Sequence, residues 1–343
     1  MRHFGTLSAR HLHVLHSIVQ EYIETGEPVA SRSIACSHPL SSASIRNIMG
    51  DLAKEGLLSQ PHTSAGRVPT DRAFQSYAQT LMGSRLVKAE LDRFQVDLER
   101  SPTVEERIER SSKLLTELTR HLGIAATFPT ENQTLDQLEL VALPDRRVLI
   151  VVVTKDKMVR HRVVNVDDHM SPEELASIRN YINYNFGGWL LSNIRQELRR
   201  RLELESAAYD AILQRTNLLY LKGLLDLGLT PEIHFEGVGN LIGLDLHLTR
   251  EKMRELFQAL EEKKRILQLL ERFLEQPNGE PEIKVGLSDV HPSMAELSLI
   301  GMRFPLPNGL EANIAVLGPM RMNYSRAISA VMHVGQAFKS ATV

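Results

Sequence analysis

The β-rich segments of this chain fall into three groups with helical sequence between them, and this spacing constrains the fold most. The first group, residues 137–166, holds the runs LELVALP, RVLIVVVT and MVRHRVVNV with turn residues between them. Such runs predict an antiparallel meander. Further β-rich runs lie at 233–238 and 282–318, after a helical stretch at about 188–228. We therefore expect one α+β domain that a mainly helical excursion interrupts.

The length of 343 residues exceeds what one hydrophobic core usually supports, so we expect several domains. Short amphipathic helices and turns fill the first 84 residues, and a helical pattern then continues to Gly123. The predicted fold class is an α+β multidomain chain. Its predicted parts are a helical head at 1–84, a helical linker at 85–123, an α/β domain at 124–187 and 229–343, and a mainly helical insertion at 188–228.

The composition, with 43% hydrophobic and 24% charged residues, is typical of a soluble globular protein. The longest purely apolar run, residues 148–153, is far shorter than the roughly 20 residues that span a bilayer. The N-terminal sequence lacks the apolar core of a signal peptide. A single cysteine, Cys36, excludes an intramolecular disulfide and a cysteine-based zinc cluster. We expect a cytoplasmic protein with no membrane partner.

Residues 42–55 predict a helix with one apolar face and one small, polar face. At 100° per residue, Ile45, Ile48, Met49 and Leu52 lie within about 60° of one line and predict the buried side. The other side carries Ala43, Asn47, Gly50 and Lys54, with Arg46 on its flank and Ser42 and Ser44 at the N-terminus. Small residues let a helix approach base edges, while Asn pairs with adenine and Arg with guanine. This face is typical of a helix that enters the major groove.

The stretch QPHTSAGRVPT, residues 60–70, follows this helix and predicts a short hairpin with Gly66 near its tip. Three helices and a hairpin form the order of a winged helix-turn-helix, in which residues 60–70 are the wing. The wing would contact phosphates, and Arg67 would reach the adjacent minor groove. The predicted DNA-contacting residues are Ser42, Ser44, Arg46, Asn47, Gly50, Lys54, His62, Thr63, Ser64, Gly66 and Arg67. The alternative is a small helical subdomain with an ordinary polar loop.

Charge alone gives little support for a nucleic-acid partner. The net charge is −2, and residues 1–84 hold seven Lys or Arg and six Asp or Glu. DNA binding therefore depends on local geometry rather than on a strong basic field. Because each head supplies few phosphate contacts, we expect that a dimer is needed for affinity.

Two segments of the chain resemble one known family. TGEPVASRSIA and SIRNIMGDLAKEGLLSQPHTSAGRVPTDRAFQSYA, within residues 25–78, closely resemble the N-terminal module of the heat-inducible transcription repressors named HrcA. AVLGPMRMNYSRAISAV, at 315–331, is similar to a late segment of the same family. The resemblance touches both ends of the chain and agrees with the length and domain order between them.

The resemblance implies more than the residue patterns do. Members of the family are dimeric repressors with a winged-helix domain, a GAF-like domain and a dimerising insertion. They bind double-stranded DNA at an inverted repeat upstream of chaperone operons. A GroEL-type chaperonin keeps them active, and heat relieves repression. In this chain the GAF-like domain would cover 124–187 and 229–343, and the dimerisation domain would cover 188–228.

Two turns depart from the family pattern. The turn Gly237–Ile242 reads GVGNLI where the family tends to have a GTSNLL-like sequence, and Gly286–Asp289 replaces a common Gly-x-Glu-Asn. These changes leave the predicted DNA contacts untouched. They put in doubt any role of the two turns in the chaperonin response or in effector sensing.

Two weaker signals suggest a ligand but have ordinary interpretations. The glycine-rich turn at 237–243 lacks the dinucleotide-binding spacing, so close packing of strand and turn explains it better. On a helix, His11 and His13 point about 200° apart, so they cannot share a metal ion. His13 and His16 could, but two neutral histidines are a poor site. We predict no cofactor and no metal.

Two further segments leave alternatives open. The charged run Arg195–Glu205 is either a solvated helix face with paired charges or a dimer or partner contact. The segment PMRMNY, Pro319–Tyr324, is either a capped turn or a contact that holds the α/β domain against the linker or the head.

The predicted function is a dimeric transcriptional repressor of heat-shock operons. The motifs of phosphate-binding loops, nucleophile elbows and zinc proteases are absent from the sequence, so we do not expect an enzyme. The alternative is a protein-interaction or small-molecule-sensing regulator that uses the winged helix as a docking surface. The stripe of Arg46 and Asn47 argues against that alternative.

Overall fold

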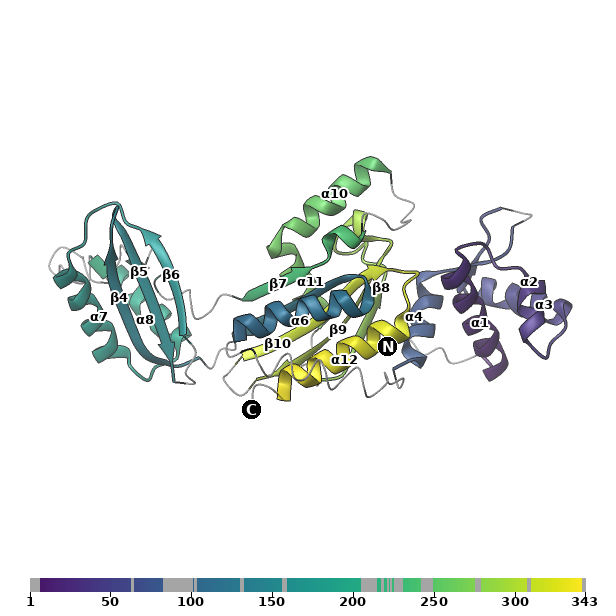
Figure 1. Ribbon diagram of the computed structural model, residues 1–343, viewed down its shortest axis with the longest axis horizontal. Helices are drawn as coiled ribbons and strands as arrows, with labels where there is room; N and C mark the ends of the chain where they lie inside the picture. The colour runs from purple at the N-terminus through teal and green to yellow at the C-terminus, as the bar shows by residue number, and fades with distance from the viewer. Residues whose placement is uncertain are drawn as a thin grey trace. The chain divides into compact units, whose positions relative to one another are not determined.

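The chain folds into two compact units of mixed α and β structure. The computed structural model describes residues 7–62, 65–82, 101, 104–129, 133–155, 159–204, 215–216, 219–220, 222, 224, 231–241, 249–274, 279–306 and 310–340. Unit 1 comprises Met1–Ala125, Ile233–Arg303 and Asn313–Ala341, and unit 2 comprises Ala126–Glu232, Phe304–Ala312 and Thr342–Val343. The prediction of a multidomain chain of mixed structure is confirmed at this level (Figure 1).

The first part of unit 1, residues 7–82, is named here the head. Its elements are α1 (Ala9–Thr25), α2 (Ser31–Ser37), α3 (Ser42–Lys54), β1 (Leu58–Ser59), β2 (Val68–Pro69) and α4 (Asp71–Thr80). Ser8 begins α1 by accepting a hydrogen bond from the His11 amide, and Gly26 ends it in the left-handed conformation. The apolar sides of the longer helices meet in a core that contains Leu15, Ile45 and Phe74. This core fixes α3 within the head.

The rest of unit 1 is built on a five-stranded sheet. Its strands are β3 (Leu122–Pro129), β7 (Glu232–Glu236), β8 (Glu282–Val285), β9 (Leu297–Pro305) and β10 (Leu310–Pro319), in the order β7-β3-β10-β9-β8. The helices are α6 (Val104–Thr119), α10 (Arg250–Glu261), α11 (Lys263–Phe273) and α12 (Tyr324–Ser340), with the short 3-10 helices η2 (Val238–Leu241) and η3 (Pro292–Met294). In this order β7 and β8 are the edge strands.

Helices cover both faces of this sheet. Helices α6 and α12 pack side by side on one face (Figure 1). Met302 of β9 lies over Gly335 of α12, whereas its neighbour Gly301 lies against Leu274, which follows α11. Because successive residues of a strand point to opposite faces, α11 and α12 lie on opposite sides. Strand β9 is accordingly buried along nearly its whole length.

The predicted helical linker at 85–123 is corrected where the structure describes it. Helix α6 is a layer of the unit 1 sheet, with Leu114 and Leu115 buried. Strand β3 begins at Leu122, where only the end of a helix was expected. Gly123 lets the strand run close to α6, because a side chain there would collide with the Ser112 carbonyl. Residues 85–100, 102 and 103 of the predicted linker lie outside the described residues.

The prediction that residues 137–166 share a sheet with the later strands is wrong. The antiparallel meander itself is confirmed, as β4 (Leu135–Leu143), β5 (Arg147–Thr154) and β6 (Val159–Asn165). These strands form a separate sheet in unit 2, with α7 (Pro172–Phe186) and α8 (Leu191–Leu204). The inserted unit therefore begins near residue 126 rather than at 188. Alternation of apolar residues shows which face of a strand is buried, but not which sheet the strand joins.

The unit 2 sheet has one buried face and one open apolar face. Val148, Ile150 and Val152 of β5 join the core that α7 and α8 close. On the other face, Val141 of β4 and Val163 of β6 are each 47% exposed. Both flank Leu149, because Val141 pairs with Leu149 and Leu149 pairs with Val163. Paired residues project from the same side of a sheet, so the three form one apolar row, named here the open row.

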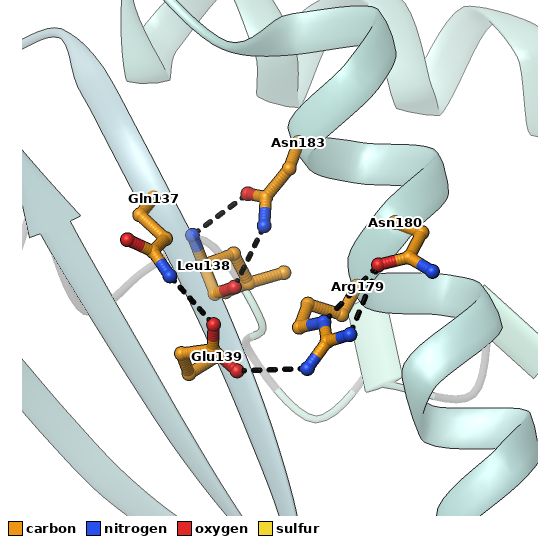
Figure 2. A network of polar contacts seen from close by, with 6 residues as sticks. All are labelled: Gln137, Leu138, Glu139, Arg179, Asn180 and Asn183. Carbon is orange, nitrogen blue, oxygen red and sulfur yellow. Dashed lines mark hydrogen bonds and ion pairs between the residues drawn. The ribbon is translucent and has the colours of Figure 1, made fainter.

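Side-chain amide chemistry attaches α7 to the edge strand β4. The Asn183 side chain donates from Nδ2 to the Leu138 carbonyl at 2.9 Å, and its Oδ1 accepts from the Leu138 amide at 2.8 Å. Figure 2 shows this pair beside the contact from Arg179 Nη1 to Glu139 Oε2, which spans 3.2 Å. Asn183 thus satisfies both peptide groups that Leu138 presents at the edge.

Candidate nucleic-acid interface

Helix α3 presents the two faces that its sequence predicts. Ile45, Ile48, Met49 and Leu52 are buried. Arg46 and Asn47 are exposed on the other side. Open space surrounds the position that a side chain at Gly50 would occupy, so this turn of the helix is accessible to a closely approaching partner. In the described head, the middle of this face therefore carries one cation, one amide and one glycine.

The serines at the start of α3 serve the head's own structure. The N-cap is Ser41, whose hydroxyl accepts from the Ser44 amide at 3.2 Å and lies 3.0 Å from the Ser44 hydroxyl. The Ser42 hydroxyl lies 3.0 Å from the Ser31 hydroxyl of α2 and ties the two helices together. The structure therefore engages the predicted contact residues Ser42 and Ser44 in capping and packing.

Lys54 at the other end of α3 is paired within the helix. Its Nζ lies 3.0 Å from Asp51 Oδ1, and both side chains are largely exposed. This hydrogen bond to the Lys54 ammonium lowers the pKa of the Asp51 carboxyl. Asp51 therefore stays ionised at neutral pH and offsets the Lys54 charge. The sequence prediction did not consider Asp51, although its spacing of three residues from Lys54 signals the pair.

In the hairpin after α3, the second arm has a hydrogen-bonded neighbour on each side. Strands β1 and β2 pair antiparallel, with Ser59 opposite Val68. On the other side, Val29 and Arg67 exchange two backbone hydrogen bonds of 2.9 and 2.8 Å. Residues 66–69 are thus the middle of a small three-part ladder that includes the chain before α2. The interaction with Val29 was not predicted from the sequence, because it joins positions far apart in the chain.

Gly66 permits this close approach. A side chain at position 66 would place its first carbon 2.6 Å from the Pro28 carbonyl oxygen and still closer to that of Val29. The collision is with backbone atoms, which cannot swing aside. Gly66 is therefore required by packing, whatever it contacts outside the head.

Arg67 and His62 lie at the hairpin in different settings. Arg67 Nη1 donates to Gln60 Oε1 at 2.7 Å, which holds the guanidinium across the hairpin. His62 is exposed, and its carbonyl accepts from the Ala65 amide at 2.9 Å. The predicted contact residues Thr63 and Ser64 lie outside the described residues.

Three histidines of the head make contacts with other parts of the head. His13 Nδ1 lies 2.8 Å from His38 Nε2, so His13 joins α1 to the chain after α2. His16 instead contacts the Tyr77 ring edge-on, with ring centroids 5.7 Å apart. Burial, and secondly the charge at His13, lowers the pKa of His16. Among the described residues, no group of three His, Cys, Asp or Glu side chains could hold a metal ion.

The alternatives left open for Pro319–Tyr324 and Arg195–Glu205 are partly decided by the contacts. The Arg321 guanidinium lies over the Tyr22 ring of α1, 5.5 Å from its centroid, so the first segment does meet the head. In α8, Arg200 and Arg201 both pair with Glu197, at 2.7 and 2.9 Å. These pairs agree with a helix face of paired charges, and Glu205 lies outside the described residues.

The turns that depart from the family pattern have packing roles. Gly237 has a φ of +92°, and a side chain there would meet Thr116 of α6. Gly286 has a φ of +71° and lies against the Asp71 carboxylate of α4. Such backbone conformations favour glycine. Ile242, at the end of the first turn, lies outside the described residues.

Among the helices that the structure describes, none combines the length and the apolar character of a membrane span.

Known proteins are similar in sequence to this chain over most of its length. A family model described as the HrcA protein C terminal domain matches residues 105–328. Heat-inducible transcription repressor HrcA of Geobacter sulfurreducens is 32% identical over 329 residues, and that of Sorangium cellulosum is 33% identical over 334 residues. Each alignment covers 95% of this chain and 95% of the relative.

One solved structure shares the fold over nearly the whole chain. It is described as the crystal structure of a hypothetical protein at 2.2 Å resolution. The likeness has a TM-score of 0.59 at 20% identity and covers 98% of this chain and 100% of the other. At this identity the likeness concerns the fold alone.

The two glycines of this interface give a matched test of the packing argument. We expect Gly66→Ala to destabilise the head by about 1–3 kcal/mol, because the bridge to Val29 must open. Gly50→Ala should be neutral or stabilising by up to about 1 kcal/mol, because alanine favours an exposed helix and meets nothing there. Urea unfolding, monitored by hydrogen exchange of amides in the head, measures the change in the free energy of unfolding for each variant. Equal stability of the two variants would contradict the assigned role of Gly66.

Proposed function

Because this chain belongs to the HrcA family of heat-inducible transcription repressors, we propose that its head is a winged-helix domain that binds operator DNA through α3. The observation that carries the proposal is the exposed face of Arg46, Asn47 and Gly50 on a helix with a firmly buried opposite side. A helix with such a face can enter the major groove, where side-chain amides and guanidinium groups distinguish bases.

Each part of the head has a separate task in this proposal. Arg46 and Asn47 read base edges, and Gly50 lets the helix approach them. His62 and the backbone at Gly66 contact the DNA phosphates from the hairpin, as do Thr63 and Ser64 in the sequence prediction. Arg67 reaches the adjacent minor groove. At the N-terminus of α3, Ser42 and Ser44 support the helix, and Lys54 lies at its C-terminus. Asp51 limits the positive charge near Lys54, so the head binds by fit more than by charge.

Sparse charge on each head supports a dimeric repressor. We propose that unit 2 is the dimerisation domain and that the five-stranded part of unit 1 is the GAF-like domain. The open row of Val141, Leu149 and Val163 supports the first assignment, because exposed apolar side chains gathered on one sheet face are typical of an interface. Helices on both faces of the unit 1 sheet support the second. Two heads on one inverted repeat would combine two weak contacts into a strong one.

Two arginine variants test the DNA proposal. Selection from a library of random duplexes should enrich an inverted repeat. Arg46→Ala should lose discrimination between that repeat and a base-substituted repeat, by about 1–3 kcal/mol for the base pair it reads. Arg67→Ala should weaken binding to all duplexes alike and reduce the slope of log affinity against log salt by about one.

A charge-matched control makes this experiment specific. Arg265→Ala removes one positive charge from α11 of unit 1, where Arg265 pairs with Glu262 at 2.6 Å, and should leave both readouts unchanged. If Arg46→Ala and Arg67→Ala bind every duplex with wild-type affinity and salt slope, the head does not read DNA in the way proposed here.

The open row can be tested by charge insertion. Val163→Glu should dissociate the dimer, because a carboxylate would be buried against an apolar surface of the second copy. Val163→Thr, which keeps the shape of valine, should have a much smaller effect. Sedimentation velocity of the full chain measures the change. A Val163→Glu protein that remains dimeric would place the interface elsewhere.

The family resemblance also supports a proposal about regulation. We propose that a GroEL-type chaperonin maintains the DNA-binding form and that heat stress, by occupying the chaperonin, relieves repression. Operator affinity after a heat pulse should recover more fully with chaperonin than without it. Equal recovery in a gel-shift titration, with serum albumin as the protein control, would contradict this part of the proposal.

A further inference from the structure

A glutamine of the head completes the edge of the unit 1 sheet. Strand β8 lies at the end of the order β7-β3-β10-β9-β8, so it has a partner strand on one side only. On its other side, Gln75 of α4 donates from Nε2 to the Ile283 carbonyl at 2.8 Å. The Val285 amide donates to Gln75 Oε1 at 3.1 Å. One carboxamide thus makes both hydrogen bonds that a neighbouring strand would make at this point.

Aromatic packing surrounds this contact. Tyr324, at the start of α12, is fully buried, and its hydroxyl contacts Ser298 Oγ and donates to the Met320 carbonyl at 2.9 Å. The rings of Phe74 and Tyr77, which flank Gln75 in α4, have centroids 6.3 Å from the Tyr324 ring. The head is therefore held by a desolvated cluster as well as by the glutamine.

Two glycines let the head and the five-stranded part of unit 1 approach each other at the edges of their contact. Gly26 leaves the space that the Arg321 guanidinium fills beside the Tyr22 ring. Gly286 faces the Asp71 carboxylate, which would lie 2.6 Å from a side-chain carbon at that position. Contacts at both α1 and α4 prevent the head from pivoting about a single point.

The position of α4 determines where the DNA face lies. Only Thr70 separates α4 from β2, and the Thr70 hydroxyl donates to the carbonyls of Gly56 and Leu57 just after α3. Phe74 belongs to the core that also holds α1 and α3. Fixing α4 on β8 therefore fixes the orientation of α3 and the hairpin with respect to the unit 1 sheet.

We infer that Gln75 is a positioning residue for operator binding. By holding α4 on β8, Gln75 sets the two heads of a dimer at the spacing of an inverted repeat. This inference rests on the function proposed above. A head that is released from β8 keeps its own DNA face, so it still binds one half of the repeat. It loses the fixed geometry that makes the second half-site contact effectively intramolecular.

The experiment compares two duplexes and three variants of the full chain. One duplex carries the inverted repeat enriched with the wild-type protein, and the other has one half of that repeat scrambled. Gln75→Ala removes both bonds to β8, and Gln75→Glu replaces the donor with a carboxylate that faces the Ile283 carbonyl. Gln79→Ala, an exposed glutamine one turn further along α4, is the matched control. Hydrogen exchange at the Val285 amide reports on docking in Gln75→Glu, because the carboxylate keeps an acceptor oxygen for that amide.

We expect faster exchange at Val285 and a loss of about tenfold or more in affinity for the full repeat with both Gln75 variants. Affinity for the half-repeat should change by less than about twofold, and Gln79→Ala should match the wild type. Unchanged or higher affinity for the full repeat would overturn the inference, as would equal losses on both duplexes or continued protection of the Val285 amide. Wild-type protein that enriches no duplex would instead contradict the proposed function itself.

Discussion

Hydrogen bonds at the edges of the two larger sheets that the structure describes are central to how this protein is assembled. A peptide group that is removed from water without a partner costs about 1–3 kcal/mol, so an edge strand must be covered or solvated. Here helices carry the missing partners as side-chain amides: Asn183 on β4 in unit 2 and Gln75 on β8 in unit 1. Each amide also fixes the helix that bears it. These bonds therefore contribute to the location of α7 and, together with the aromatic cluster at Tyr324, to that of the head.

The elements formed by short-range patterns could be predicted, but their partners could not. The two faces of α3 and the antiparallel meander follow from periodicity, which depends on neighbouring residues. The assignment of residues 137–166 to the later sheet failed, because alternating valines fit any half-buried strand. Strand β3 escaped prediction because LGIAATFP contains glycine and alanine, which are weak strand formers. Burial between helices stabilises it in place of intrinsic preference.

The same division applies to the candidate interface. Arg46 and Asn47 are exposed as predicted, because one helix determines their direction. Ser42 was expected to face a partner, but its hydroxyl meets Ser31, which lies on another helix. The contact of His13 with His38 was not predicted, because it too joins distant segments. Gly66 was predicted at a hairpin tip, whereas its main constraint is the backbone at Pro28 and Val29. Contacts between distant segments carry no signature in a single sequence.

The glutamine-covered edge of β8 has a consequence for solubility. If α4 leaves that edge, the peptide groups of Ile283 and Val285 face solvent unpaired, and an exposed edge strand is a template for strand addition by another chain. Docking of the head thus shields a surface that would otherwise favour aggregation. Release of the head and self-association of the protein would then both involve the peptide groups of Ile283 and Val285. Under the function proposed above, release of the head would remove both the DNA-binding geometry and the protection against aggregation in a single event.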